Sequence, residues 1–292
     1  MNHPKHIPVL LPEVLSLLKP QKGDSYLDLT AGYGGHAKAI RKLLGESGSL
    51  TLVDRDKQAI EALTEAFTED HNAKIMHNDF LTASKQLNAA NEKYDVILAD
   101  LGVSSQHLNK ANRGFSFSKA GPLDMRMDQS QGLSAEEVAN EYDEDQLNKI
   151  LREYGEIRKS RDLAQHILKG RPYKDTLELS KQVARFFKIK GRKDPSTQTF
   201  QAFRIEVNSE LTQLEQSLPI WLELLKPGGR LGVISFHSLE DRIVKQFFKD
   251  YGGKRYDARL HIITKKPVMG SDKEVVFNPR ARSAKLRVAQ RK

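Results

Sequence analysis

Residues 25–36 read Ser-Tyr-Leu-Asp-Leu-Thr-Ala-Gly-Tyr-Gly-Gly-His. The run from Ser25 to Thr30 is short and mostly apolar, and three glycines among the next five residues mark a turn. An apolar helical pattern follows over residues 37–44. A buried strand, a glycine turn and a helix form one βα unit, so this stretch predicts an α/β fold on a parallel sheet.

The same alternation continues on both sides of a long interruption, which predicts a doubly wound, Rossmann-like sheet. Before the interruption, strands are expected at 50–53, 74–77 and 94–99, with a helix at 57–67. After it, we expect a helix at 199–225, a turn at 226–229, a strand at 230–236, a helix at 239–248, and apolar segments at 260–264 and 286–289 that can close the sheet.

The interruption predicts an inserted, all-helical domain. Residues 102–133 are rich in Gly, Ser and Asn, and residues 134–190 read as polar amphipathic helices without a strand. Ser134 and Glu137 have the spacing of a capping box, which opens one of these helices. The expected domains are 1–104 (first part of the sheet domain), 105–198 (inserted helical domain) and 199–292 (second part of the sheet domain, with a basic C-terminal segment).

Composition excludes several kinds of site. The 292 residues contain no cysteine, so disulfides, thiolate nucleophiles and zinc sites made of Cys ligands are excluded. No run of about 18 apolar residues can span a membrane, and the first ten residues lack the pattern of a secretory signal. We therefore expect a cytoplasmic protein that has no membrane partner.

The positive charge of the chain is concentrated in two places. Residues 242–292 hold fifteen Lys and Arg against four Asp and Glu, although the whole chain has a net charge of +9. A second stretch without acids contains Lys181, Arg185, Lys188, Lys190, Arg192 and Lys193. Either stretch alone can be a solvated surface, but two such stretches favour binding to the phosphates of a nucleic acid.

The glycine turn and Asp54 predict a site for an adenosine-containing cofactor. Asp54 lies at the expected end of the second strand, where a carboxylate can accept hydrogen bonds from both hydroxyls of a ribose. Gly32, Gly34 and Ala37 also fit a dinucleotide fingerprint, so NAD is an alternative. Asp28 favours S-adenosylmethionine, since a carboxylate suits a sulfonium and an ammonium better than a pyrophosphate; otherwise it is a strand acid satisfied by backbone donors.

Other side chains are expected near the same edge of the sheet. Phe80 can place an aromatic face against adenine, or belong to the core. Asp100 follows the strand at 94–99 and can hold and orient the amino group of a nucleic-acid base, or cap the turn before Gly102. His237 can contact a base or be a structural histidine. His36, at a helix start, supplies backbone donors more readily than it acts as a general base. We expect no metal.

Many ordered blocks of the chain resemble one family, the bacterial ribosomal RNA small subunit methyltransferase H or MraW family. The blocks are His6–Val9, Asp28–His36, Asp100–Ser105, Arg113–Phe117, Pro122–Asp128, Gln201–Ile205, Ser235–Arg242 and Asn278–Ser283. The resemblance implies a class I methyltransferase sheet with a helical insertion. It also implies transfer of a methyl group from S-adenosylmethionine to the N4 amino group of a cytidine in the decoding region of 16S ribosomal RNA. The expected partner is this RNA within the small ribosomal subunit, and not DNA.

The resemblance also implies a set of cofactor contacts. In this chain they are Gly34, Gly35, His36, Asp54, Phe80, Asp100 and, after the Asp100 loop, His107. At the last position the chain departs from the family, which reads Ser-Ser-Pro-Gln where residues 104–107 are Ser-Ser-Gln-His. Either Gln106 or His107 can fill that contact. Asp100 is the expected catalytic residue. An NAD-dependent dehydrogenase and a non-catalytic RNA-binding module are the alternatives.

Overall fold

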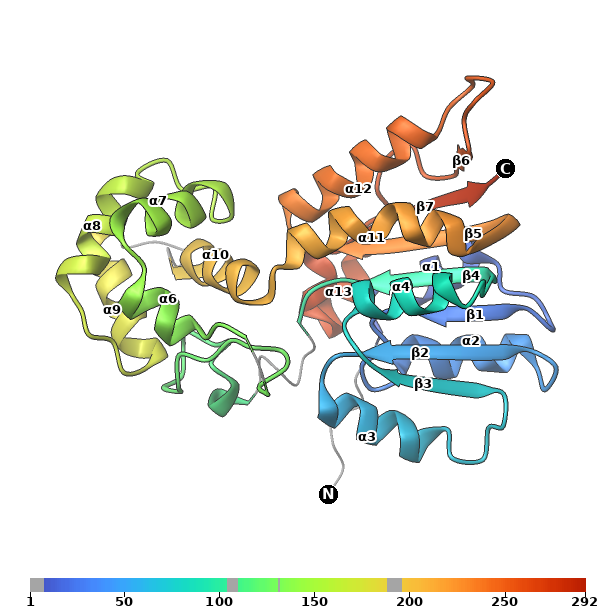
Figure 1. Cartoon of the computed structure of the whole chain (residues 1–292), viewed down its shortest axis with the longest axis horizontal. Helices are drawn as coiled ribbons and strands as arrows, with labels where there is room; N and C mark the ends of the chain where they lie inside the picture. Colours follow the sequence, from blue (N-terminus) through green and yellow to red (C-terminus); the bar gives the residue numbers. More distant parts are fainter. Residues whose placement is uncertain (1–7, 104–109, 131, 188–195) are drawn as a thin grey trace. The chain divides into compact units, whose positions relative to one another are not determined.

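The computed structural model describes residues 8–103, 110–130, 132–187 and 196–292 of the chain (Figure 1). The chain forms two compact units. The first, here called the sheet unit, comprises residues 1–102 and 211–292, and the second, the helical unit, comprises residues 103–210.

The sheet unit contains one sheet of seven strands in the order β3-β2-β1-β4-β5-β7-β6. Neighbouring strands are parallel from β3 to β5, whereas β7 is antiparallel to both β5 and β6. The strands are β1 (Ser25–Asp28), β2 (Ser49–Asp54), β3 (Ala73–His77), β4 (Tyr94–Asp100), β5 (Leu225–Ser235), β6 (Leu260–Ile262) and β7 (Lys285–Arg291). This topology confirms the predicted fold class, a class I Rossmann-like α/β sheet.

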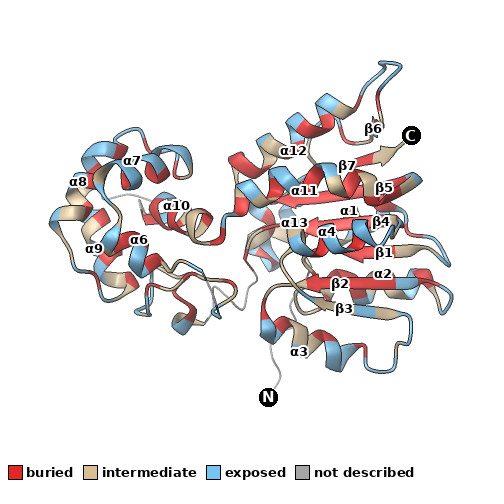
Figure 2. Cartoon of the chain, in the orientation of Figure 1, coloured by how far each residue is buried: buried red, intermediate tan, exposed pale blue. Residues whose placement is uncertain are grey.

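Helices cover both faces of this sheet. One face packs on α4 (Phe80–Ala89), α11 (Glu210–Leu224) and α12 (Ser238–Tyr251), and the other on α1 (Leu11–Leu18), α2 (Gly35–Leu44) and α3 (Lys57–Ala66). The central strands are therefore buried on both sides, as Figure 2 shows. Burial on both sides explains why residues 96–99 read as a continuous apolar run and do not alternate.

Two boundaries in the second half of the chain differ from the sequence-based prediction. The helix expected at 199–225 is two helices, α10 (Ser196–Asn208) and α11, because Ser209 between them has a left-handed backbone (φ 50°). The turn expected at 226–229 lies inside β5, which already begins at Leu225. The register against β4 shifts there, so these residues form an irregularity within the strand.

The helical unit has its own core, as an inserted domain requires. Its helices are α6 (Ala135–Glu141), α7 (Glu144–Glu153), α8 (Ser160–Lys169), α9 (Thr176–Phe187) and α10, after a short 3₁₀ turn, η1 (Ala111–Arg113). The predicted capping box of Ser134 and Glu137 is confirmed at the start of α6. Phe200 and Phe203 of α10 pack in this core, so the unit extends to residue 210, beyond the expected boundary at 198.

No helix in the part of the chain that the structure describes is both long and apolar enough to span a membrane.

Asn208, at the end of α10, forms hydrogen bonds with two buried backbone groups of the helical unit. Its Oδ1 accepts from the Met127 N–H at 2.9 Å, and its Nδ2 donates to the Met125 carbonyl at 2.8 Å. Asn208→Ala is expected to lower the free energy of unfolding by about 2–4 kcal/mol, because both groups lose their partner inside the protein. Urea denaturation measures this loss. The exposed Asn88→Ala is the control and should change the value by less than about 0.5 kcal/mol; equal effects would contradict the assignment.

Candidate active site

The topology of the sheet fixes where a ligand can bind. The chain passes from β1 outward through β2 and β3 and then returns to β4 on the other side of β1. Connections after β1 and β4 therefore leave in opposite directions, and a crevice at the carboxyl ends of such strands is the usual ligand site of an open α/β sheet. Asp28 is the last residue of β1 and Asp100 the last residue of β4.

The glycine turn after β1 is held by the carboxylate at the end of β2. Asp54 Oδ2 accepts from the Gly32 N–H, and Oδ1 accepts from the Asp56 N–H, both at 2.8 Å. Gly32 and Gly34 have left-handed backbones (φ 53° and 78°), which glycine adopts without strain. The structure thus brings together Asp54 and the glycines that the sequence predicted to act together.

Gly35 begins α2 and has no room for a side chain. A Cβ at this position would lie 2.8 Å from Cγ of Pro8, a residue that precedes α1. The segment before α1 therefore packs directly on the start of α2.

Asp28 is satisfied within the strand and the turn. Its Oδ2 accepts from the Tyr26 hydroxyl at 2.8 Å, and its Oδ1 accepts from the Thr30 N–H at 3.2 Å. The side chain is buried. Of the two readings of Asp28, the structure supports the strand acid with local donors, although one of them is a tyrosine hydroxyl that the sequence did not indicate.

Asp100 is held by its backbone and has one carboxylate oxygen without a partner. Its N–H donates to Thr30 Oγ1 at 2.6 Å, which fixes the end of β4 against the turn after β1. Its Oδ1 is buried and has no hydrogen-bond partner among the described residues. Its Oδ2 lies 4.0 Å from Nδ1 of His36, whose Nε2 donates to the Val9 carbonyl at 3.0 Å. His36, the second residue of α2, is thus a buried, structural neighbour of Asp100.

Burial controls the ionisation of this group of side chains. It raises the pKa of Asp28 to about 6 and the pKa of Asp100 to about 7, while it lowers the pKa of His36 below its usual value. The positive charge of Arg280 opposes the rise in the pKa of Asp100, and the negative charge of Glu240 adds to it. Near neutral pH, His36 is therefore neutral and Asp100 is part ionised.

Phe80 begins α4 and is partly buried. Its ring packs edge-on against Trp221 of α11, with ring centroids 5.7 Å apart, and Trp221 Nε1 donates to Ser84 Oγ at 2.8 Å. Phe80 therefore belongs to the margin of the core, and whether its remaining surface contacts adenine stays a prediction.

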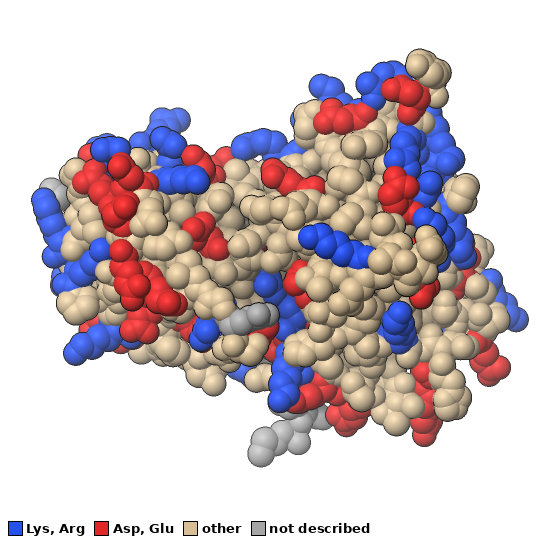
Figure 3. All heavy atoms as spheres, viewed as in Figure 1, with Lys and Arg blue, Asp and Glu red and all other residues tan. Residues whose placement is uncertain are grey.

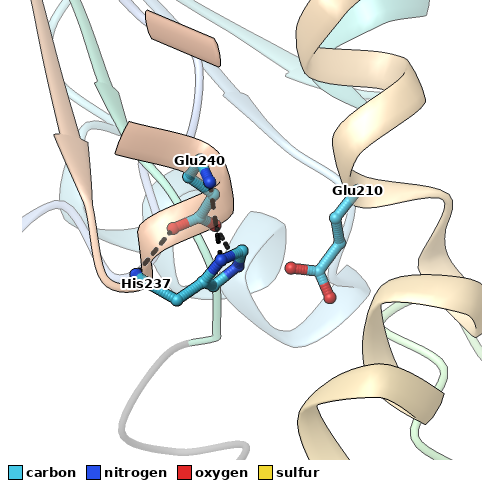
Figure 4. A group of neighbouring side chains, drawn as sticks. All are labelled: Glu210, His237 and Glu240. Atoms are coloured by element: carbon cyan, nitrogen blue, oxygen red, sulfur yellow. Dashed lines mark hydrogen bonds and ion pairs between the residues drawn. The ribbon is translucent and has the colours of Figure 1, made fainter. Parts of the chain in front are cut away.

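His237 caps α12. Its Nδ1 accepts from the Glu240 N–H at 3.5 Å, its Nε2 lies 3.2 Å from Glu240 Oε1, and Glu240 Oε2 accepts from the N–H groups of His237 and Phe236 (Figure 4). The structure therefore supports a structural histidine at this position. Glu210, also drawn in Figure 4, forms a two-point ion pair with Arg204 at 2.8 and 2.9 Å.

Several predicted positions lie outside the described residues. These are Gln106 and His107, the two serines before them, and the part of the second basic stretch from Lys188 to Lys193. Of that stretch, Lys181 and Arg185 lie on α9.

Sequence reasoning missed three side chains of the site. The Tyr26 hydroxyl donates to the Asp28 carboxylate, and the Thr30 hydroxyl accepts from the Asp100 N–H. Both residues stand inside the stretch that predicted the fold, where the mostly apolar strand pattern gives no hint of a polar role. Arg280 lies far from Asp100 in the sequence, and its positive charge opposes the rise in the pKa of Asp100. Its only signal was its place in the Asn278–Ser283 block.

Comparison with known proteins shows the family of the chain. The model of the MraW methylase family matches residues 3–292 of the chain. Three relatives are named ribosomal RNA small subunit methyltransferase H. The chain is 43% identical to that of Caldicellulosiruptor saccharolyticus (98% of this chain and 99% of the relative covered), 44% to that of Synechocystis (98% and 93%) and 41% to that of Acidobacterium capsulatum (100% and 100%).

The match extends over nearly the whole chain at more than 40% identity. It confirms S-adenosylmethionine as the cofactor, and it excludes the alternatives of an NAD-dependent dehydrogenase and of a module without catalysis. The chain belongs to the MraW methylase family and is an S-adenosylmethionine-dependent methyltransferase.

Proposed function

We propose that the chain methylates the N4 amino group of a cytidine in the decoding region of 16S ribosomal RNA, within the small ribosomal subunit. The names of the relatives support the class of RNA. The observation that carries the chemistry is Asp100, whose Oδ1 is buried at the carboxyl end of β4 without a partner among the described residues. A buried acceptor of this kind requires a donor, and an amino group supplies one.

The amino group of cytosine needs such a partner because it is a poor nucleophile. Its lone pair is delocalised into the ring, so the nitrogen must be held with its lone pair directed at the methyl carbon. A carboxylate that accepts one N–H aligns the nitrogen and stabilises the positive charge that it gains. Once methylated, the nitrogen becomes acidic, and a carboxylate with a pKa of about 7 is a suitable acceptor for its proton.

The residues at the carboxyl ends of β1 and β2 fit the cofactor, which supplies the methyl group. Among the described residues, a Cβ at Gly32 would meet only the Thr30 carbonyl, at 3.9 Å, so they leave the backbone of this glycine open to a ligand. Asp54 Oδ2 accepts from the Gly32 N–H and Oδ1 from the Asp56 N–H, and these bonds hold the carboxylate at the end of β2 beside the glycine turn, where a ribose would bind. We propose that Gly34, Gly35 and His36 contact the cofactor through their backbone, with Phe80 on the adenine side and His107 as a further contact.

The target cytosine has to leave any stack to reach Asp100, so an unpaired segment is the expected substrate. Ribosomal RNA as substrate would also place the protein in the cytoplasm. The experiment that tests the proposal is mass mapping of 16S ribosomal RNA from cells that lack the protein and from cells that regain it. One methylated cytidine in the decoding region should disappear and return. An unchanged map would contradict the proposed substrate.

Asp54 provides a test of the cofactor site. Asp54→Ala should weaken S-adenosylmethionine binding by about 1.5–3 kcal/mol, because a charged acceptor of hydrogen bonds is lost. Asp54→Asn keeps one acceptor oxygen and should lose less. Calorimetric titration measures both affinities, and wild-type affinity in the alanine variant would remove the ribose contact from the proposal.

Asp100 provides a test of the chemistry and of its cost in stability. Asp100→Asn should lower the single-turnover rate by about 10²–10³ at saturating cofactor and RNA. The same change should raise the free energy of unfolding of the cofactor-free protein at pH 8, by roughly 1–3 kcal/mol. The folded-state pKa of Asp100 is raised, so the stability that its protonated form contributes is present below pH about 4 and is lost as the pH rises through about 7.

The gain in stability should therefore shrink as the pH falls toward 4. Asp95, on the same strand, is the matched control because its pKa is lowered: its Oδ2 accepts from Lys226 Nζ and from the Ser25 N–H and hydroxyl. Asp95→Asn should lower the stability at pH 8. If both variants changed stability in the same direction, burial of the Asp100 charge would not explain the result.

A further inference from the structure

The segment between β6 and β7 lies at the same edge of the sheet as Asp100. It contains α13 (Asp272–Phe277) and the 3₁₀ turn η2 (Pro279–Arg282). It leads into Lys285, which pairs with Ser235 at the carboxyl end of β5. Figure 1 shows α13 beside the carboxyl ends of the parallel strands. The segment is anchored there because Glu274 Oε1 accepts from the Leu10 N–H at 2.7 Å and Ala281 is buried in the core.

This segment exposes two neighbouring apolar side chains. Val276 is 74% exposed and Phe277 is 77% exposed, and no residue of α13 is buried. The next residue, Asn278, is buried, and its N–H donates to the Glu274 carbonyl at 2.7 Å, so the end of the helix is fixed. An anchored, water-exposed phenylalanine contributes little to the fold, since its ring is not removed from water. Its surface is available for a partner.

The surroundings of these side chains are positively charged. Residues 265–285 include six Lys and Arg against Asp272 and Glu274. Lys273 and Arg282 are exposed, and no carboxylate within the described ranges forms an ion pair with either. The Arg280 guanidinium lies 5.1 Å from the centroid of the Phe236 ring, and its charge acts on Asp100. The apolar pair thus stands on a basic surface close to the proposed reaction centre.

We propose that α13 and η2 form a subsite for single-stranded RNA next to the methylated nucleotide, in which one base stacks on Phe277 and phosphates bind Arg282 and Lys273. Val276 extends the apolar surface under the base. An exposed aromatic ring among Lys and Arg is the combination that holds unpaired RNA, whose bases have free faces. The inference rests on the proposed function and adds how the substrate strand is held.

The sheet unit offers a matched control at its other edge. Tyr256 is a fully exposed aromatic residue in the connection between α12 and β6. This connection leads to the edge of the sheet where the parallel strands begin, because Leu260, the first residue of β6, pairs with Arg291 at the end of the antiparallel strand β7. Its neighbourhood is basic as well. Figure 3 shows Lys and Arg gathered over α12 and the β6 edge of this unit. A general effect of exposed aromatic residues in basic surroundings would therefore involve Tyr256 equally.

The test is the affinity for a labelled single-stranded RNA of about twelve nucleotides with a central cytidine, measured by fluorescence anisotropy. Phe277→Ala should raise the Kd about 5- to 100-fold, the range for loss of one stacked base, while Phe277→Trp should keep the wild-type Kd. Cofactor affinity should not change. Arg282→Gln should reduce the slope of log Kd against log salt by about 0.7, the value for one phosphate of a single strand, whereas Phe277→Ala should leave that slope unchanged.

Tyr256→Ala should bind the RNA as the wild type does. An unchanged Kd in Phe277→Ala, an equal loss in Tyr256→Ala, or no RNA binding by the wild type would each overturn the subsite. The mass map of ribosomal RNA is independent of these outcomes. A Phe277-dependent affinity in a protein that leaves the decoding region unmethylated would contradict the proposed function and support the subsite, and the reverse result would contradict the subsite alone.

Discussion

The burial of two carboxyl groups where β1 and β4 diverge is the constraint around which the sheet unit is arranged. Asp28 and Asp100 stand at adjacent strand ends, where little of either side chain is in contact with water, and only Asp28 has fixed donors for its carboxylate among the described residues. Thr30 serves both, since its N–H binds Asp28 and its hydroxyl accepts from the Asp100 N–H. The turn proposed to line the cofactor site and the strand that ends at Asp100 are therefore held by the same residue, and a shift of one moves the other.

This arrangement trades stability for binding. A protein without ligand that keeps Asp100 partly ionised in a buried position is less stable than one with a neutral side chain there. In the proposed reaction, the cofactor would bring positive charge and the acceptor N–H groups, so the ligands would supply the partners that the Asp100 carboxylate lacks within the described residues. A carboxylate with so few donors is expected at a functional site, whereas Asp95, whose Oδ2 accepts from Ser25 and Lys226, shows how the same residue type is used for structure.

Much of the fold could be predicted from the sequence, because parallel strands with buried faces and glycine turns leave strong local patterns. The same logic placed Asp54 and Asp100 at one sheet edge, since the carboxyl ends of parallel strands lie together. What could not be predicted depends on long-range packing. The edge-on contact of Phe80 with Trp221, the cap that His237 makes for α12, and the charge of Arg280 near Asp100 are set by the tertiary structure. The break at Ser209 was missed because serine rarely signals a left-handed backbone.

The position of β7 has a consequence for how the chain folds during its synthesis. β7 lies between β5 and β6, although it follows both in the chain. A nascent chain that has emerged only as far as residue 284 therefore has β5 with an unpaired edge and β6 with no neighbour. The helical unit is continuous in the sequence and is complete at residue 210, whereas the sheet that carries the candidate active site is completed only when residues 285–291 insert. Until then, the exposed edge of β5 is the place where this chain is open to pairing with the wrong partner.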